Sequence, residues 1–581
     1  MLWAMYLLPH LASAQRTEVS FSYAWRFHYG PGGDDAGAGP GNAWAAAFSD
    51  IITNCTDGYP DPHRMTSTDC ATSCAYDPSC FAWIHVPGVA RCAHHPSTTT
   101  CSHAASNATA NGARRAAATP LQTAYAWGAA SLPEADAWDL VDAPHDGLAS
   151  LRGSFSEAGG DSRHGYRVRT VLWYRKNFSL PAAWGADGGP TFLRFDGIMH
   201  FAQVWVNGAY VGAHSSTYTP WAVRLDNVSG IAFGAGAANV VAVRADASYG
   251  SEHWYGGGGL IRPVHLVHVG PQAFVESGVW VPPELPAGST TVAASAEWEN
   301  AAAAPATGAV LLEVRDPAGA VVASAQSAAA PAPGGGAATA RSTASLARPA
   351  SVALWAPAAP AHYTLTATLL VGGAPVDVVN ATVGFRRTRW DPATGFAING
   401  VGIKQRGFSH HNSFAGVGVA MPQRLDLFRA QVSRALGGNI WRMSHNPYRS
   451  GLYDVLDLLG VLAWDENRDM GPSYVWEMHD MVKRGRNHPS IIVNSLCNEI
   501  ECDNLPSVGL AMVNYSKALD PTRPTTANSD SDDGLGAIID IQGFSHKAPP
   551  AFVAAHQANP NQPLVLCVRA RFFFCAQGAS C

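Results

Sequence analysis

The chain has 581 residues, of which 47% are hydrophobic and 14% are charged, and its formal net charge is −6. This length accommodates three or four domains, and the hydrophobic content excludes a wholly disordered chain. The small acidic excess, with no run of Lys or Arg, argues against nucleic acid as the main partner, because bound phosphates are neutralised by basic side chains.

The first fourteen residues have the pattern of a signal peptide. Residues 1–14 are apolar and end in Ala12-Ser13-Ala14, a pattern that signal peptidase cleaves. The alternative is an apolar stretch that leads into a first strand. No later segment is long and apolar enough to span a bilayer. We therefore expect a protein without a membrane span, in a secreted or endomembrane, lysosome-like compartment.

A cysteine-rich segment, residues 50–104, interrupts the first predicted strands. Its even number of closely spaced cysteines predicts disulfide bonds formed in an oxidising compartment, and zinc binding is disfavoured because paired C-x2-C spacings are missing. The segment resembles PAN/apple modules, which bind proteins or carbohydrates, and a disulfide-stapled surface loop is the alternative. A low-complexity linker, residues 105–120, follows it. The cysteines are Cys55, Cys70, Cys74, Cys80, Cys92 and Cys101.

Residues 15–49 and 121–270 predict an antiparallel β-sandwich. Short runs such as 174–178, 202–206 and 239–245 are rich in β-branched and aromatic residues. The dipeptide Asn207-Gly208, placed between two of these runs, is the signal of a tight hairpin turn.

Residues 271–387 predict a second sandwich of the immunoglobulin-like type. Strands are expected at 309–314 and 363–371, and an Ala/Pro/Gly-rich loop is expected near 325–340.

From residue 388 to residue 581 the hydrophobic period changes to an alternation of short strands and helices. This alternation predicts a parallel (β/α)8 TIM barrel, in which functional groups lie at the carboxyl ends of the strands. A glutamate at the end of a buried apolar strand, as at 491–499, is suited to general acid/base chemistry. Helices are expected at 423–436 (with Leu425, Phe428 and Val432 at helical spacing), 452–459 and 476–483, and strands at 439–442, 461–466 and 491–499.

Several motifs along the chain, in the order found here, closely resemble those of glycoside hydrolase family two, the group of β-galactosidases, β-glucuronidases and β-mannosidases. The resemblance covers most of the chain outside the cysteine-rich segment. It implies a galactose-binding-like jelly-roll sandwich, an immunoglobulin-like sandwich and a TIM barrel, a glycoside or oligosaccharide substrate, and a possible homo-oligomer. The motifs are 142–146, 195–197, 204–208 and 254–262 in the first sandwich, 354–357 with Pro360 and Tyr363 in the second, and 442–447, 465–466 and 497–499 in the barrel.

By this resemblance Glu499 would be the general acid/base, protonating the leaving oxygen and then activating water. Asn498 would hydrogen-bond the sugar 2-hydroxyl, and His445 and Arg442 would contact the substrate. His411 matches a histidine of the first-strand motif, or is a structural histidine.

The first-strand motif departs from the family pattern, and the role of Asp465 remains open. The first-strand motif is altered, with Ser409 and Asn412 where the family usually shows Asn and Glu. Asp465, beside Glu466, would contact the substrate or form a structural salt bridge with a barrel arginine.

No metal or other cofactor is assigned. Some β-galactosidases bind Mg²⁺ near the third strand of the barrel, so Mg²⁺ is possible by resemblance. The residues that follow this strand, Asn467-Arg468-Asp469, depart from that ligand pattern.

A retaining mechanism needs a second carboxylate about 5 Å from the first. By resemblance this nucleophile would follow the run Pro563–Leu566, but no Asp or Glu occurs after Asp540. We therefore expect a barrel truncated at its C-terminus whose nucleophile, expected just after Leu566, is missing. An inverting pair of Glu499 with Glu501 is the other arrangement that the sequence allows.

The expected function is cleavage of terminal β-linked sugars, most closely of the β-galactosidase type. The alternatives are a β-glucuronidase or β-mannosidase, or a catalytically inactive member that binds glycans.

Overall fold

The computed structural model describes residues 16–30, 84–86, 89–91, 138–149, 167–248, 255–336, 338–348, 351–468, 472–499, 506–529, 535–547 and 549–568. Several predicted features lie outside these residues: the signal peptide, the six clustered cysteines, the linker 105–120, Glu501 and everything after Val568. Of the cysteine-rich segment, only the antiparallel pair β3 (Ile84–Val86) and β4 (Val89–Arg91) is described.

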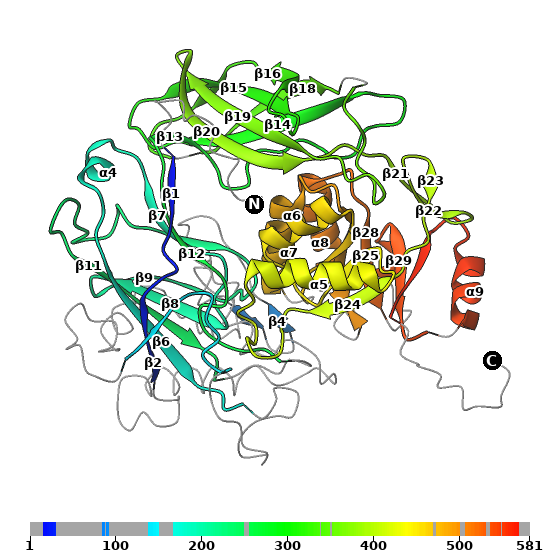
Figure 1. Cartoon of the computed structure of the whole chain (residues 1–581), viewed down its shortest axis with the longest axis horizontal. Helices are drawn as coiled ribbons and strands as arrows, with labels where there is room; N and C mark the ends of the chain where they lie inside the picture. The colour runs from blue at the N-terminus through cyan, green and yellow to red at the C-terminus, as the bar shows by residue number, and fades with distance from the viewer. Residues whose placement is uncertain are drawn as a thin grey trace.

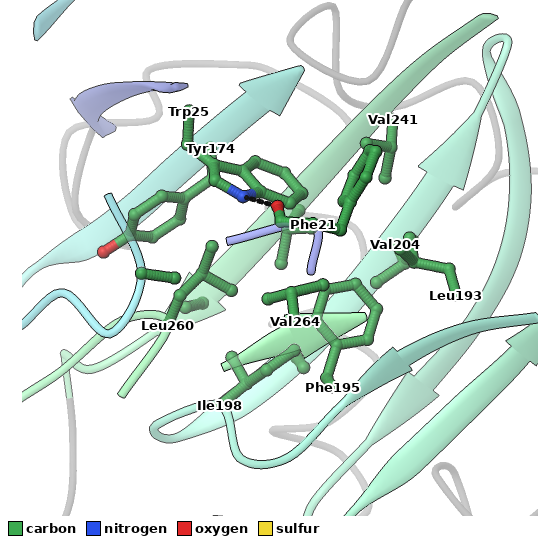
Figure 2. Close-up of a cluster of buried hydrophobic side chains, with 14 of the residues drawn as sticks. Phe21, Trp25, Tyr174, Leu193, Phe195, Ile198, Val204, Val241, Leu260 and Val264 are labelled. Carbon is green, nitrogen blue, oxygen red and sulfur yellow. Dashed lines mark hydrogen bonds between the residues drawn. The ribbon is translucent and has the colours of Figure 1, made fainter. Parts of the chain in front are cut away.

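The first domain is a sandwich of two sheets, as predicted from its alternating strands. Inward side chains of both sheets form one core, in which Phe21, Trp25 and Phe195 lie close together (Figure 2). Asn207 (φ 51°) and Gly208 (φ 80°) form the predicted hairpin turn. One sheet has the order β1 (Thr17–Ser20), β12 (Val264–His268), β7 (Thr191–Phe195), β10 (Trp221–Arg224); the other has the order β5 (Asp139–Val141), β2 (Trp25–Gly30), β6 (Val171–Phe178), β11 (Asn239–Asp246), β8 (Phe201–Val206), β9 (Ala209–His214). The short helix α4 (Ala182–Ala186) follows β6.

The second domain is also a sandwich, packed around the fully buried Trp298. The prediction of a loop near residues 325–340 is wrong in part. This region contains the short strand β17 (Ala330–Ala332), which pairs with β15. One sheet has the order β13 (Gln272–Phe274), β14 (Thr291–Asn300), β18 (Ala340–Ala347), and the other β16 (Val321–Gln326), β15 (Ala306–Arg315), β19 (Tyr363–Val371), β20 (Ala374–Val383). A small antiparallel sheet, β21 (Thr388–Asp391), β22 (Gly395–Ile398) and β23 (Val401–Gly402), leads into the third domain.

The third domain is a curled sheet of parallel strands joined by helices, a partial barrel (Figure 1). Its strands pair in chain order, so their carboxyl ends gather along one edge. The strands are β24 (Gly407–His411), β25 (Ile440–Ser444), β26 (Leu462–Glu466), β27 (Ile491–Asn498), β28 (Thr525–Ser529), β29 (Ile541–Ser545) and β30 (Leu564–Val568). The helices are α5 (Gln423–Ala435), α6 (Ser450–Leu459), α7 (Pro472–Gly485), α8 (Pro506–Leu519) and α9 (Pro549–Ala558), with a 3-10 turn at Leu535–Ala537.

Helix α5 presents some of its apolar residues outward, while Leu427 packs against the core. Phe428 and Val432, two of the residues whose spacing predicted this helix, are exposed, whereas Asp426, Ala430 and Ser433 are buried. Asp426 is accommodated because Arg449 pairs with it. In the part of the chain that the structure describes, no helix is both long and apolar enough to cross a membrane.

Candidate active site

Polar side chains from neighbouring strands converge at the carboxyl edge of the parallel sheet. Arg442 of β25 donates from Nε and Nη2 to both carboxylate oxygens of Glu466 at 2.9 and 2.8 Å, and from Nη2 to Asn498 Oδ1 at 2.7 Å. Asn528 of β28 also donates to Asn498 Oδ1, at 2.8 Å. The predicted site residues Arg442 and Asn498 are therefore brought together, with Glu466 and Asn528 beside them.

His445 joins this cluster through Glu466. Its Nδ1 lies 2.6 Å from Glu466 Oε1, and because a carboxylate only accepts, Nδ1 carries the hydrogen. Burial lowers the pKa of His445. Burial alone would raise the pKa of the fully buried Glu466, but the charge of Arg442 and the hydrogen bond from His445 lower it overall. The arrangement is a neutral histidine oriented by an ionised, arginine-paired carboxylate.

The predicted acid/base, Glu499, directly follows β27 in a left-handed backbone conformation (φ 48°). Its side chain is 29% exposed, so the carboxyl group can meet a ligand. Glu499 Oε1 accepts a hydrogen bond from Ser545 Oγ at 2.6 Å and lies 3.0 Å from His546 Nε2. Both contacts come from the end of β29.

The histidines of β24 lie on different sides of their strand. The His411 ring lies 5.4 Å from the His445 ring in an edge-on arrangement, so His411 borders the cluster. Burial, and then the electrostatic interactions with His445 and Arg442, lower the pKa of His411 to about 4. His410 instead stacks on Trp441, and Ser409 accepts a hydrogen bond from Arg442 Nη1 at 3.3 Å.

The structure places Asp465 away from this cluster, which corrects the expectation of substrate contact. Successive residues of a strand point to opposite faces, so Glu466 faces the cluster and Asp465 faces the helices. The Tyr453 hydroxyl of α6 donates to Asp465 Oδ1 at 2.8 Å, and Asp465 is 1% exposed. The salt bridge with a barrel arginine, foreseen for this pair of acids, is made by Glu466 with Arg442.

Two stretches of the first sandwich hold the loops around the site. Asp146 accepts hydrogen bonds from the backbone N–H of Gly258 and of Val419, the latter in the loop between β24 and α5. Arg262 donates to the carbonyl oxygen of Pro447, in the loop after β25, at 2.7 Å. The sandwich motifs 142–146 and 254–262 therefore contact the loops of the barrel.

The residues near the third strand do not fit a Mg²⁺ site. Both oxygens of Glu466 are engaged by Arg442 and His445. Within the described ranges no cluster of three or more His, Cys, Asp or Glu side chains could hold a metal ion. No step proposed below passes through a metal.

Sequence reasoning missed Asn528, Ser545 and His546. Each lies at or just after the end of a parallel strand. Their position at the strand ends was the signal that could have found them, because the carboxyl edge collects functional groups in such a sheet. The strands themselves, β28 and β29, were not predicted individually.

Sequence models of one enzyme family match three segments of the chain. The sugar-binding domain of glycosyl hydrolases family 2 matches residues 164–268, a second family 2 domain matches residues 273–386, and the family 2 TIM barrel domain matches residues 466–571. The first two segments correspond to most of the two sandwiches, and the third, which begins at the last residue of β26, corresponds to the later part of the partial barrel.

Named proteins and solved structures that are similar to this chain point to the same family. A β-galactosidase of Bacteroides ovatus is 28% identical over 483 residues (70% of this chain, 53% of the relative), and a β-glucuronidase of Bacteroides fragilis is 27% identical over 405 residues (63% and 56%). The crystal structure of a family 2 member from Bacteroides cellulosilyticus superposes with a TM-score of 0.68 at 25% identity, covering 76% of this chain and 59% of that one. The chain thus spans less than two thirds of the length of these relatives. From its three matched domains, it belongs to glycosyl hydrolases family 2.

Proposed function

We propose that this chain cleaves terminal β-linked sugars, with Glu499 as the general acid/base. The observation that carries the proposal is the convergence of Arg442, His445, Glu466 and Asn498 beside Glu499 at one edge of the parallel sheet. A partly exposed carboxyl group next to a rigid polar cluster can bind a hydroxylated ring and protonate the oxygen that leaves it.

Asn498 would bind a sugar hydroxyl in a fixed orientation. Its side-chain oxygen accepts from both Arg442 and Asn528. These two donors determine which way the amide faces, and the NH2 group on its other side is left to donate to a substrate oxygen. His445, with Nδ1 committed to Glu466, would use Nε2 towards the substrate.

Glu499 would act twice in the proposed reaction. Its acid form gives a proton to the glycosidic oxygen as the bond from that oxygen to the anomeric carbon breaks, and its carboxylate then takes a proton from the attacking water. A retaining reaction also needs a nucleophilic carboxylate on the opposite face of the sugar. The residues that follow Leu566 in this sequence include no Asp or Glu.

Two sugars are candidates for the substrate. We propose a β-galactoside first, and a β-glucuronide as the second candidate, because similar relatives carry each name. Binding of a glycan without turnover is the third outcome that the experiment below separates.

The test is hydrolysis of nitrophenyl β-galactoside, β-glucuronide and β-mannoside by the parent chain and by Glu499→Gln, each with and without sodium azide. Azide can attack the anomeric carbon in place of the second carboxylate, giving an α-glycosyl azide and a nitrophenol. Turnover of one sugar by the parent, lost in Glu499→Gln and kept in the exposed control Glu299→Gln, would support the proposal and name the sugar.

The azide arm separates two explanations. Turnover only with azide would support the acid/base role and show that this chain does not itself supply the nucleophile. A folded chain that reacts with none of the sugars in either arm would contradict the proposed activity, and sugar binding measured by calorimetry would then favour a glycan-binding role.

A further inference from the structure

Two residues with strained backbone face each other at the site. Glu499 (φ 48°) and His546 (φ 55°) are non-glycine residues in the left-handed region, and their side chains are 3.0 Å apart. This conformation is uncommon for non-glycine residues, although His, like Asn and Asp, adopts it more readily than Glu does, and it persists where the surrounding structure enforces it. The surroundings of Glu499 therefore hold its backbone in a conformation that a glutamate does not favour by itself.

Two contacts from the end of β29 converge on a single oxygen of Glu499. Ser545 Oγ donates to Oε1 at 2.6 Å, and His546 Nε2 lies 3.0 Å from the same atom. Ser545 is fully buried, whereas the His546 side chain is 44% exposed. One contact is therefore fixed by packing and the other is open to solvent.

A regular strand could not make both contacts, because its successive side chains point to opposite faces. The chain leaves the regular strand conformation directly after Ser545, where His546 lies in the left-handed region. This turn re-aims the His546 side chain, so that two consecutive residues reach the same carboxylate oxygen.

We propose that Ser545 and His546 are positioning residues that keep Glu499 Oε1 as a hydrogen-bond acceptor, so that Glu499 carries its transferable proton on Oε2. An oxygen that accepts a hydrogen bond from Ser545 and lies 3.0 Å from His546 Nε2 is the less favourable place for a proton. The proton would leave from Oε2 to the glycosidic oxygen, and the resulting carboxylate would be stabilised by Ser545 Oγ and by a protonated His546 on Oε1. This inference rests on the proposed function of Glu499.

Other ionisable groups near Glu499 are already paired. The His445 imidazole, just after β25, interacts electrostatically with Glu499 and is bound to Glu466 of β26. Arg442 of β25 is engaged by Glu466 and Asn498. Among the residues that the structure describes, the hydrogen bond and the ion pair of the Glu499 carboxylate come from the end of β29, which makes that strand end the place to test.

The test titrates the Glu499 carboxyl group directly, without turnover. Chains carrying ¹³C at the glutamate carboxyl carbon are titrated by NMR, and the Glu499 signal is assigned by its loss in Glu499→Gln. In Ser545→Ala and in His546→Asn the midpoint of this signal should move to higher pH by about one unit, because a donor to the ionised form is lost. Asn suits position 546 because it tolerates the left-handed backbone.

Matched controls carry the same substitutions elsewhere. Ser490→Ala removes a buried serine just before β27, and His556→Asn changes an exposed histidine on α9. Both should leave the Glu499 midpoint in place. A midpoint that stays in place in Ser545→Ala and His546→Asn would overturn the inference. Since the titration needs no substrate, a chain that shows the shift but cleaves no glycoside would contradict the proposed function and not the positioning.

Discussion

At the scale of residues, the two neighbouring acids of β26 point to opposite faces of the sheet and differ in their pKa shifts. Glu466 faces the cluster, where Arg442 and His445 keep its pKa low despite burial. Asp465 faces the helices, where burial raises its pKa to about 6, and the hydrogen bond from Tyr453 offsets only part of this effect. One acid is thus held ionised for the site, while the other makes the fold sensitive to pH.

Asp465→Asn should increase stability more at neutral than at acidic pH. The folded-state pKa lies above the ordinary value of 3.8, so the folded chain binds this proton more tightly and its free energy of unfolding falls as pH rises from about 4 to about 6. The loss amounts to roughly 3 kcal/mol as an upper bound, and Asn, which still accepts from Tyr453, avoids it.

Urea denaturation of parent and variant across this pH range would measure the difference. Asp540→Asn is the contrasting control. Burial raises the pKa of Asp540, but the hydrogen bond from Lys517 and others outweigh it and lower that pKa, so its contribution to stability is lost as pH falls. If the gain in the free energy of unfolding of Asp465→Asn did not change with pH, the raised pKa of Asp465 would be contradicted.

The site residues that the sequence could predict are those inside recognisable motifs. Arg442, His445, Asn498 and the position of Glu499 at a strand end follow from local pattern. Ser545 was not predicted because its strand, β29, was not recognised in the sequence. For Asp465 the sequence left substrate contact and a structural role open, and its contact with Tyr453 follows because successive residues of a strand point to opposite faces.

At the scale of elements, two barrel helices end in left-handed glycines with different surroundings. Gly437 (φ 87°), just after α5, has open space where a side chain would be, whereas Gly460 (φ 67°), at the end of α6, would place a Cβ 2.4 Å from the carbonyl oxygen of Pro357. The second sandwich docks at this helix end, where Trp355 donates to the Asp457 carbonyl at 2.9 Å. The family motif 354–357 is therefore a contact between domains.

Gly437→Ala and Gly460→Ala should separate backbone strain from steric conflict. Both substitutions force alanine into the left-handed region, which costs about 1–2 kcal/mol. Gly460→Ala should cost clearly more, because the backbone of Pro357 must also move. Chemical denaturation would give the free energy of unfolding of both variants. Equal losses of this free energy would show that the Pro357 backbone moves away at no energetic cost.

Helices α5, α6 and α7 and strands β25, β26 and β27 of the barrel were predicted from the sequence, with boundaries shifted by a few residues. The helix predicted at 476–483 extends over Pro472–Gly485, and that at 452–459 begins at Ser450. The burial of α5 was not predictable from its spacing, because the face that packs inward is made of Ala430, Ser433 and the paired Asp426. Tertiary contact here overrides the amphipathic pattern.

At the scale of the whole molecule, the first sandwich stabilises loops around the candidate site. Among the described residues, it contributes no acid/base group to that site. Arg262 is 3% exposed, and burial lowers its pKa to about 9, yet it donates to Pro447 in the loop after His445. The division into two sandwiches and a barrel was predictable from the change of hydrophobic period. The contacts between them were not, because they join residues far apart in sequence.

Arg262→Met should loosen the loop after β25 without unfolding the barrel. Met keeps the apolar volume but leaves the Pro447 carbonyl without this donor, at a cost of about 1–3 kcal/mol. Hydrogen exchange followed by mass spectrometry should show faster exchange at residues 445–449. Arg341→Met, in the second sandwich, should leave that loop unchanged, and unchanged exchange in Arg262→Met itself would refute the coupling.

The strand pairing also sets an order of assembly on the ribosome. Thr17 of β1 pairs with His268 of β12, so the first strand leaves the ribosome long before its partner is made. The strands of the partial barrel, by contrast, each pair with the strand made just before, so this sheet can grow as synthesis proceeds. The nascent chain must therefore keep its first apolar strands from wrong partners until the whole first sandwich has been translated.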